Sequence, residues 1–443
     1  MINDHHLIPG SVILQASDPL LTSACGKPWK TDAAILRLPK RGQAHWTDQR
    51  VPVQFFRHIP DVDPFSEMFP RENQQDAEHE CQKRLERITA AAELLFATQH
   101  RLFLFMLVVV GRNFRLIRWD RAGVIVTPLT DYYDNPAVLC DFLRRLSFLD
   151  DTSLGFDPSA TRLLARDADF LRMDTAATPN PCDIDHAEGT REEGEIKGAH
   201  VFRYVRSLFR GSLTSDWPRY RLQVPDGDKV RDYLVGKPIV QRSGVTGRGT
   251  RGYVALDCET GCFVWLKDAW RASVLIAVRE GDVLRELNEA GIENVPTLVC
   301  HGDINDHATV TDIWWERKHP ASSTPQPSPS RPESSTCTPD SSTNRKRKRG
   351  GRNHNEDAHS QPRKRRSSPS EIAGPGYRGP PQRHTHYRIV VQEVAMSLRN
   401  IQSGKQLSSI VLDCLHGEHC FITRMPCSYF LAWQRTIRRA LTR

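Results

Sequence analysis

The chain has no long apolar run and no pattern of paired cysteines. Its longest apolar segment, Leu102–Val110, has nine residues, about half the length that a membrane-spanning helix needs. The eleven cysteines are scattered without paired spacing, and Met1–Pro9 contains no apolar core of the kind that a secretory signal has. We therefore expect no membrane interaction and an intracellular protein with reduced thiols.

The positive charge of the chain is concentrated in one segment. Arg345–Arg349 and Arg363–Arg366 carry nine positive charges, whereas the net charge is +8, so the remainder is near neutral. They lie in residues 318–383, where Ser, Pro, Thr and basic residues dominate and few apolar residues remain. Such a segment cannot bury enough surface to offset its ordering entropy, so we expect it to be disordered.

The two basic clusters are thirteen residues apart, which is typical of a bipartite nuclear-import signal. This spacing predicts an import receptor as partner and a nuclear location, with the cytoplasm as the alternative. Solvated charge or nonspecific nucleic-acid contact would explain the same clusters.

The rest of the sequence predicts an α+β fold with two ordered parts. Helical patterns over 74–99 and 137–149 enclose three predicted strands, which indicates a small α+β domain. A second part combines an antiparallel sheet with a helix over 274–290. Its predicted strands are 230–240, 253–256, 263–266, 295–299 and 310–315. Residues 201–209 are compatible with either a strand or a short helix, and a further strand is expected over 386–394.

These patterns divide the chain into six segments. We expect an irregular N-terminal region (1–73), an N-terminal α+β domain (74–165), a connecting region (166–229), a sheet with one helix (230–317), the disordered basic segment (318–383) and a strand with a divergent tail (384–443).

A glycine motif stands at the centre of the second part. Gly247, Gly249 and Gly252 have the spacing G-x-G-x-x-G, with Val254 two residues later and Lys267 fifteen residues after the last glycine. In a dinucleotide-binding unit this loop opens a helix, whereas here Tyr253–Leu256 and the following turn favour a strand hairpin. Glycine loop, hairpin and lysine together are typical of the phosphate-binding half of a protein kinase.

Such a lysine needs an acidic partner on the next helix. Glu280 is the first choice because Leu284 and Leu287 follow it on the same helical face, and Glu286 is the alternative. The competing interpretation is a glycine-rich hairpin with an exposed lysine and ordinary helix charges.

The chain resembles the fungal-type protein kinase family. The resemblance rests on Leu116–Gly123, Gly155–Pro158, Gly247–Tyr253, Leu266–Arg271 and Leu287–Gly291. It implies a kinase-like small lobe that binds ATP and a protein substrate, with Gly247, Gly249, Gly252 and Val254 around the nucleotide. It further implies that Lys267 holds the α and β phosphates and that Glu280 orients Lys267.

The catalytic half of such an enzyme is not found in the sequence. There is no H-R-D and no D-F-G motif, and the near match His301-Gly302-Asp303 lacks the metal-binding asparagine, because position 308 is Ala308. Fewer than 50 residues follow Leu398, so we expect the C-terminal lobe to be missing. No catalytic residue, no magnesium ligand and no other metal site is predicted, and whether the chain is an enzyme stays open. A noncatalytic interaction protein and a nuclear nucleic-acid-associated protein are the alternatives.

Cysteines and histidines near the C-terminal end do not predict zinc. Their spacing matches no usual C-x-x-C pair. The residues concerned are Cys414, His416, His419, Cys420 and Cys427.

Overall fold

The computed structural model describes most of the chain outside the basic segment. The described residues are 2–16, 21–22, 31–37, 44–59, 62–65, 75–184, 201–272, 278–319, 381–401 and 403–424. The basic clusters at 345–349 and 363–366 lie outside them, so predicted disorder and nuclear import stay predictions. Among the described helices, none is both long enough and apolar enough to cross a membrane.

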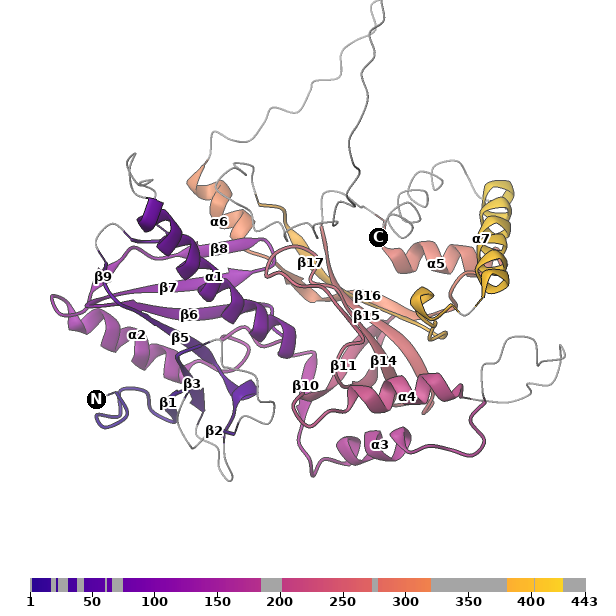
Figure 1. The fold of residues 1–443 in the computed structure, drawn as a ribbon, viewed down its shortest axis with the longest axis horizontal. Coiled ribbons are helices and arrows are strands. Elements are labelled where there is room, and N and C mark those ends of the chain that lie inside the picture. Colours follow the sequence, from indigo (N-terminus) through magenta and orange to yellow (C-terminus); the bar gives the residue numbers. More distant parts are fainter. Residues whose placement is uncertain are drawn as a thin grey trace, which may run out of the picture.

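The N-terminal half folds around a mixed seven-stranded sheet (Figure 1). Its strand order is β1-β3-β5-β6-β7-β8, with β9 paired to β7. The strands are β1 Ser11–Gln15, β3 Ala33–Arg37, β5 Val51–Phe56, β6 Phe103–Val110, β7 Asn113–Asp120, β8 Gly123–Val126 and β9 Thr130–Asp131. A short parallel pair, β2 Leu21–Thr22 and β4 Ala44–His45, and a 3₁₀ turn, Trp46–Asp48, complete this region.

Two helices cover the two faces of this sheet. Helix α1 (Gln75–Thr98) packs Ile88 and Leu95 on Leu104 and Met106, whereas α2 (Pro136–Phe148) packs on the opposite face, against Leu107 and its neighbours. Alternate residues of β6 therefore serve two separate apolar cores, which explains why this strand is a continuous apolar run.

The described parts of residues 1–73 are not irregular, in contrast to the prediction from the sequence. They supply β1, β3 and β5, and β5 pairs in parallel with β6. These strands have five or six residues each, and none of them pairs with the segment that directly follows it through a tight turn. Local periodicity is too brief to reveal such strands, because long-range pairing stabilises them.

The second sheet has eight strands in the order β10-β11-β12-β14-β15-β17-β16, with β13 on β14. It curves so that β11 also contacts β16, and an apolar core that includes Leu222, Tyr253 and Leu266 fills the concave side. The strands are β10 Ala160–Leu163, β11 Arg219–Asp226, β12 Lys229–Val235, β13 Val240–Gln241, β14 Arg251–Asp257, β15 Phe263–Ala272, β16 Leu298–Ala308 and β17 His384–Val391.

Three helices pack on the outside of this curved sheet. They are α3 Ala168–Ala177, α4 Arg203–Ser212 and α5 Glu280–Glu289. The described residues of the predicted connecting region (166–229) thus supply α3, α4 and β11 to the second sheet and its covering helices, and most of the 201–209 stretch lies in helix α4. The described chain ends with a 3₁₀ turn, Leu398–Asn400, and α7 Gly404–Arg424.

The predicted strand over 310–315 is wrong, because this stretch begins helix α6 (Thr311–Lys318). The amides of Val310 and Thr311 both donate to Asp120 Oδ2, at 3.1 Å each. A carboxylate at a helix N-terminus satisfies free amide groups and complements the helix dipole. Asp120 belongs to β7, so the sequence around 310–315 gives no sign of this cap.

A buried polar seam joins the two sheets. Arg388 on β17 donates to Asp157 at 2.6 Å and to Asp268 at 3.3 Å, and its side chain has no exposed surface. Arg251 on β14 donates to Asp268 at 2.8 Å and contacts His100, which follows α1. Two arginines thus neutralise two aspartates that water cannot reach, and the seam fixes the position of β14, β15 and β17 relative to the N-terminal sheet.

Replacing Arg388 with Met should destabilise the protein strongly. The change leaves Asp157 and Asp268 buried with part of their charge uncompensated, which typically costs about 3–5 kcal/mol. Urea unfolding at neutral pH measures the free energy. The matched control is Arg145→Met on the exposed side of α2, with an expected cost below about 0.5 kcal/mol. Equal effects of the two substitutions would contradict the role of the seam.

Acidification should weaken the folded state in two stages. Burial, followed by the charge of Arg251, lowers the pKa of His100 to about 3. Burial alone would raise the pKa values of Asp157 and Asp268, but the neighbouring cationic groups outweigh it and hold both below the ordinary value. All three groups bind protons more weakly in the folded state, so stability is complete at neutral pH and decreases as the pH falls.

Thermal unfolding from pH 7.5 to pH 3 tests this expectation. The melting temperature should decline between about pH 6.5 and 3 through His100, and more steeply below about pH 4 as the aspartates begin to titrate. A melting temperature that rises as the pH falls from 7.5 to 3 would show that the seam has a different protonation state.

Candidate functional site

The glycine motif and the lysine meet on one face of the second sheet. Strands β14 and β15 are antiparallel, with Gly252 opposite Lys267, Val254 opposite Trp265 and Leu256 opposite Phe263. Residues directly opposite each other point to the same side of a sheet. We call the surface formed by these six residues the lysine face.

Lys267 is paired with Glu280 on this face. Lys267 Nζ lies 2.5 Å from Glu280 Oε2, and the exposed fractions of the two side chains are 25% and 42%. Glu280 is the first residue of α5, and Leu284 of the same helix packs against Tyr387, Ile389 and Val391 of β17. Because α5 packs in this position, Lys267 pairs with Glu280, which was the first choice from the sequence.

The three glycines serve different structural purposes. Gly247 and Gly249 have positive φ angles of 84° and 46°, which L side chains rarely adopt. Gly252 lies within β14, and a Cβ atom there would come within 2.4 Å of the Trp265 ring. Trp265 occupies the position of the alanine in the kinase motif V-A-I-K, so its ring fills space beside Gly252.

The glycine loop is bound to the N-terminal domain through Arg121. The Arg121 carbonyl accepts the Gly247 amide at 2.8 Å, and its guanidinium donates to the Val245 carbonyl at 2.9 Å. The same guanidinium lies against Gly249 and above the ring of Phe96, 4.6 Å from the ring centroid. The Gly247 amide is therefore engaged within the protein and does not point to an open site.

Sequence reasoning missed Arg121 as part of this site. It lies between β7 and β8, more than 120 residues before the loop that it contacts. The only hint was that both segments belong to the strings on which the family resemblance rests.

Helices α3 and α4 cover one end of the lysine face (Figure 1). Val254 and Leu256 are 1% and 2% exposed, and they belong to an apolar cluster with Met173 of α3 and Phe209 of α4. The rings of Phe209 and Phe263 lie 4.9 Å apart between centroids. Val254, predicted to contact the nucleotide, is thus in contact with the protein's own helices.

Each end of α4 forms a hydrogen bond with a segment that directly follows a strand of the second sheet. The Tyr204 hydroxyl donates to the Val394 carbonyl at 2.5 Å, just beyond β17. The Ser212 carbonyl accepts the Lys237 amide at 2.8 Å, at the start of the segment that leads to the glycine loop.

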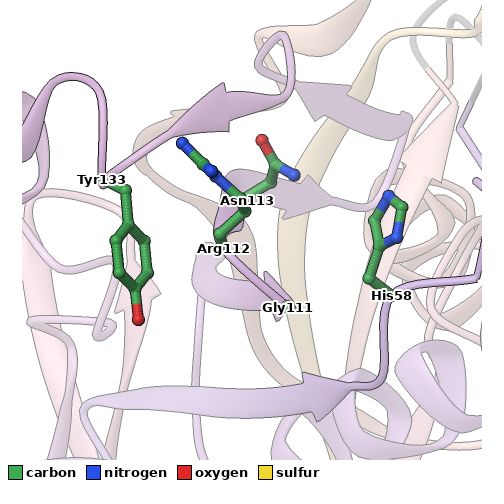
Figure 2. Close-up of a pocket in the computed structure, with 5 residues that line it drawn as sticks. All are labelled: His58, Gly111, Arg112, Asn113 and Tyr133. Atoms are coloured by element: carbon green, nitrogen blue, oxygen red, sulfur yellow. The ribbon is translucent and has the colours of Figure 1, made fainter.

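Two surface cavities lie away from the lysine face. One, of about 490 Å³, is lined by His58, Gly111, Arg112, Asn113 and Tyr133 on the N-terminal domain (Figure 2). The charge of Arg112 is balanced there by Asp131 and Asp134. The other, of about 410 Å³, lies between α1 and the glycine segment, where Arg121, Gly249 and Arg251 line it. Neither contains Lys267 or Val254.

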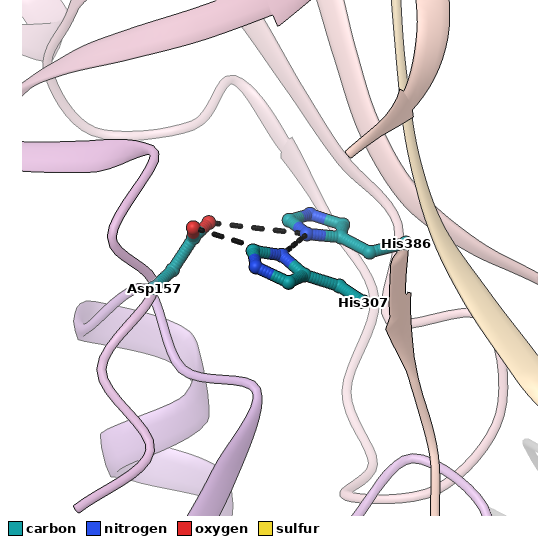
Figure 3. A group of neighbouring side chains, drawn as sticks. All are labelled: Asp157, His307 and His386. Carbon is teal, nitrogen blue, oxygen red and sulfur yellow. Dashed lines mark hydrogen bonds and ion pairs between the residues drawn. The ribbon is translucent and has the colours of Figure 1, made fainter. Parts of the chain in front are cut away.

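Three side chains of the seam form the one candidate metal group that the described residues contain. The ligating atoms of Asp157, His307 and His386 lie within 4.8 Å of one another, and the two histidine Nδ1 atoms are 3.5 Å apart (Figure 3). Zinc commonly uses three such ligands.

The other contacts of this group do not suit a cation. Asp157 Oδ2 accepts from Arg388 at 2.6 Å, and Oδ1 accepts from the amide and hydroxyl of Ser159 at 2.8 and 2.5 Å. The carboxylate lone pairs are largely occupied, and the arginine places a positive charge beside the position that a metal would take. We therefore assign the three residues to the seam between the sheets.

The His301-Gly302-Asp303 segment has no free carboxylate for catalysis. It lies inside β16, and Arg271 binds Asp303 with two hydrogen bonds of 2.7 and 2.6 Å. His301 contacts the Tyr387 hydroxyl and Arg285, at 3.1 and 2.9 Å. The segment supports the helix that carries Glu280, because Gly281 packs directly on the His301 ring.

Comparisons with known proteins agree with the resemblance drawn from the sequence. No curated protein and no solved structure matches the chain. A family model described as fungal protein kinase matches residues 58–423, which include most of the first sheet and all of the lysine face. The chain therefore belongs to the fungal protein kinase family.

Proposed function

We propose that this chain is an ATP-binding lobe of the kinase type that does not itself transfer the phosphoryl group. The observation that carries the proposal is the ion pair between Lys267 and Glu280, formed across β15 and α5 beside the glycine loop. Family membership supports ATP and protein substrates as the class of ligand.

Each residue of the pair has a distinct role in this proposal. The Lys267 ammonium offers three donors and a positive charge to the α and β phosphates of ATP. Glu280 holds the ammonium over the sheet, since a free lysine side chain would sample many conformations. The pair is partly exposed, so phosphates can approach it from solvent.

Phosphoryl transfer requires groups that the sequence does not offer. A catalytic aspartate must orient the attacking hydroxyl, and carboxylate and amide oxygens must hold magnesium. The chain has neither an H-R-D nor a D-F-G motif, and Asp303 in the nearest substitute is bound to Arg271. We therefore assign nucleotide binding without turnover, and a role through partner proteins rather than catalysis.

Lys267→Met should abolish the response of the protein to ATP. Millimolar ATP should raise the melting temperature of the unmodified chain, and the substitution should weaken binding at least about tenfold because it removes the charge and keeps the alkyl chain. Glu280→Gln should weaken binding less, since the lysine remains charged. Lys229→Met, at an exposed position of β12, is the control and should behave like the unmodified chain. Stabilisation by ATP that persists in Lys267→Met would refute the assignment.

The chain should release no phosphate from ATP above the rate in buffer. A measurement with radiolabelled ATP, magnesium and a mixed protein substrate tests this, with Lys267→Met as the comparison. Turnover that depends on Lys267 would show that a catalytic carboxylate exists which the motifs do not reveal.

A further inference from the structure

We propose that helix α4 acts as an internal gate, which occupies the apolar part of the lysine face and must leave before ATP can bind fully. The inference rests on the proposed function, because it concerns access to the same face. Three helices contact this face, and they hold or cover four of its six residues. Lys267 is held by α5, whereas Val254, Leu256 and Phe263 are covered by α3 and α4.

The covered part is the part that a nucleotide base would need. Ligand sites are mostly apolar with a few convergent polar groups. On this face the polar group is Lys267, and the adjacent apolar residues are Val254 and Trp265 on neighbouring strands. Because Val254 is 1% exposed and packs in the same cluster as Phe209, the phosphates have an accessible partner in Lys267 but the base does not.

Helix α4 is suited to reversible docking. It has ten residues and no side-chain cap at its N-terminus, so it is too short to be stable alone in water. Its apolar residues Val205 and Phe209 face the sheet, whereas Arg203 and Arg210 are exposed. Tertiary contacts therefore determine whether α4 stays in place.

Polar contacts hold α4 at both of its ends, and one of them can be removed without leaving a cavity. The Tyr204 hydroxyl donates to the Val394 carbonyl at 2.5 Å, and Arg206 binds Asp183 and the Ala176 carbonyl within the α3–α4 unit. Tyr204→Phe deletes the first contact and leaves the ring in place. It should loosen α4 while the sheet stays intact.

If α4 is a gate, a substitution that removes one of its native contacts should increase the affinity for ATP. If the open state is a minor fraction, the apparent affinity for ATP is reduced by that fraction, and any change that raises the fraction tightens binding. Loss of this one partly buried hydrogen bond, at about 1 kcal/mol, should increase the open fraction, and so the ATP affinity, about fivefold. Phe209→Ala should increase it further, because it removes a fully buried aromatic ring that packs in the cluster with Val254.

The experiment measures ATP affinity and hydrogen exchange on the full chain. Tyr204→Phe and Phe209→Ala should bind ATP more tightly and exchange α4 amides faster, and saturating ATP should accelerate α4 exchange in the unmodified protein. Tyr132→Phe is the matched control, because its hydroxyl also donates to a backbone carbonyl, that of Gly111 at 3.0 Å, on the other domain. It should change neither ATP affinity nor α4 exchange.

The possible outcomes separate the gate from the proposed function. If ATP binds all variants equally although α4 exchanges faster, the gate is wrong and nucleotide binding stands. If ATP binds none of them although α4 is released, nucleotide binding by this lobe is wrong, and the gate with it. Slower hydrogen exchange of the α4 amides in the presence of ATP would also overturn the gate, because it would mean that α4 stays docked when ATP is bound.

Discussion

The guanidinium of Arg388 is buried between two carboxylates that come from different parts of the chain. Asp157 follows the N-terminal domain, and Asp268 follows Lys267 on β15. A charge without access to water must be paired, so the two sheets can approach only in the arrangement that satisfies all three groups. That arrangement brings Arg121 to the glycine loop.

The position of Lys267 follows from this constraint. Asp268 points into the seam, and its neighbour Lys267 must point to the opposite side of β15, because side chains alternate along a strand. Helix α5 then supplies Glu280, and His301, Gly281 and Tyr387 fix the place of that helix. Charge pairs therefore organise both faces of the strand, one buried and the other partly exposed.

The hydrophobic effect explains why helices α3 and α4 cover part of the lysine face. Val254, Leu256 and Phe263 would form an apolar patch if nothing packed on them, and burial of such a patch is favourable at about 25 cal/mol per Å². Helices α3 and α4 provide that burial within the described chain. In the proposed function, a nucleotide would compete with the protein's own side chains for this surface, and the strength of α4 packing would decide which of the two occupies it.

Local patterns anticipated the long elements well. The apolar run of β6 and the helical spacing of α1 and α2 are close to their predicted bounds, because each is determined mainly by neighbours in sequence. The hairpin of β14 and β15 was also predicted, but β15 continues six residues beyond its predicted end. The short strands β1 and β3 and helix α3 were not anticipated, and α4 was expected only as a strand or a short helix. Their stability comes from partners far along the chain, and periodicity over five to ten residues carries little information.

The same division applies to the candidate site. The sequence by itself determined the family, because the family is identified by residue type and order. For the same reason it identified the spacing of the three glycines, Lys267, and Glu280 and Glu286 as the two candidate partners of the lysine. Only the tertiary structure decided that Glu280 reaches the lysine, that Arg121 holds the glycine loop and that α4 covers Val254. These contacts join different strands and helices, so they depend on how sheets and helices pack, and packing selects among many pairings that the sequence leaves equally open.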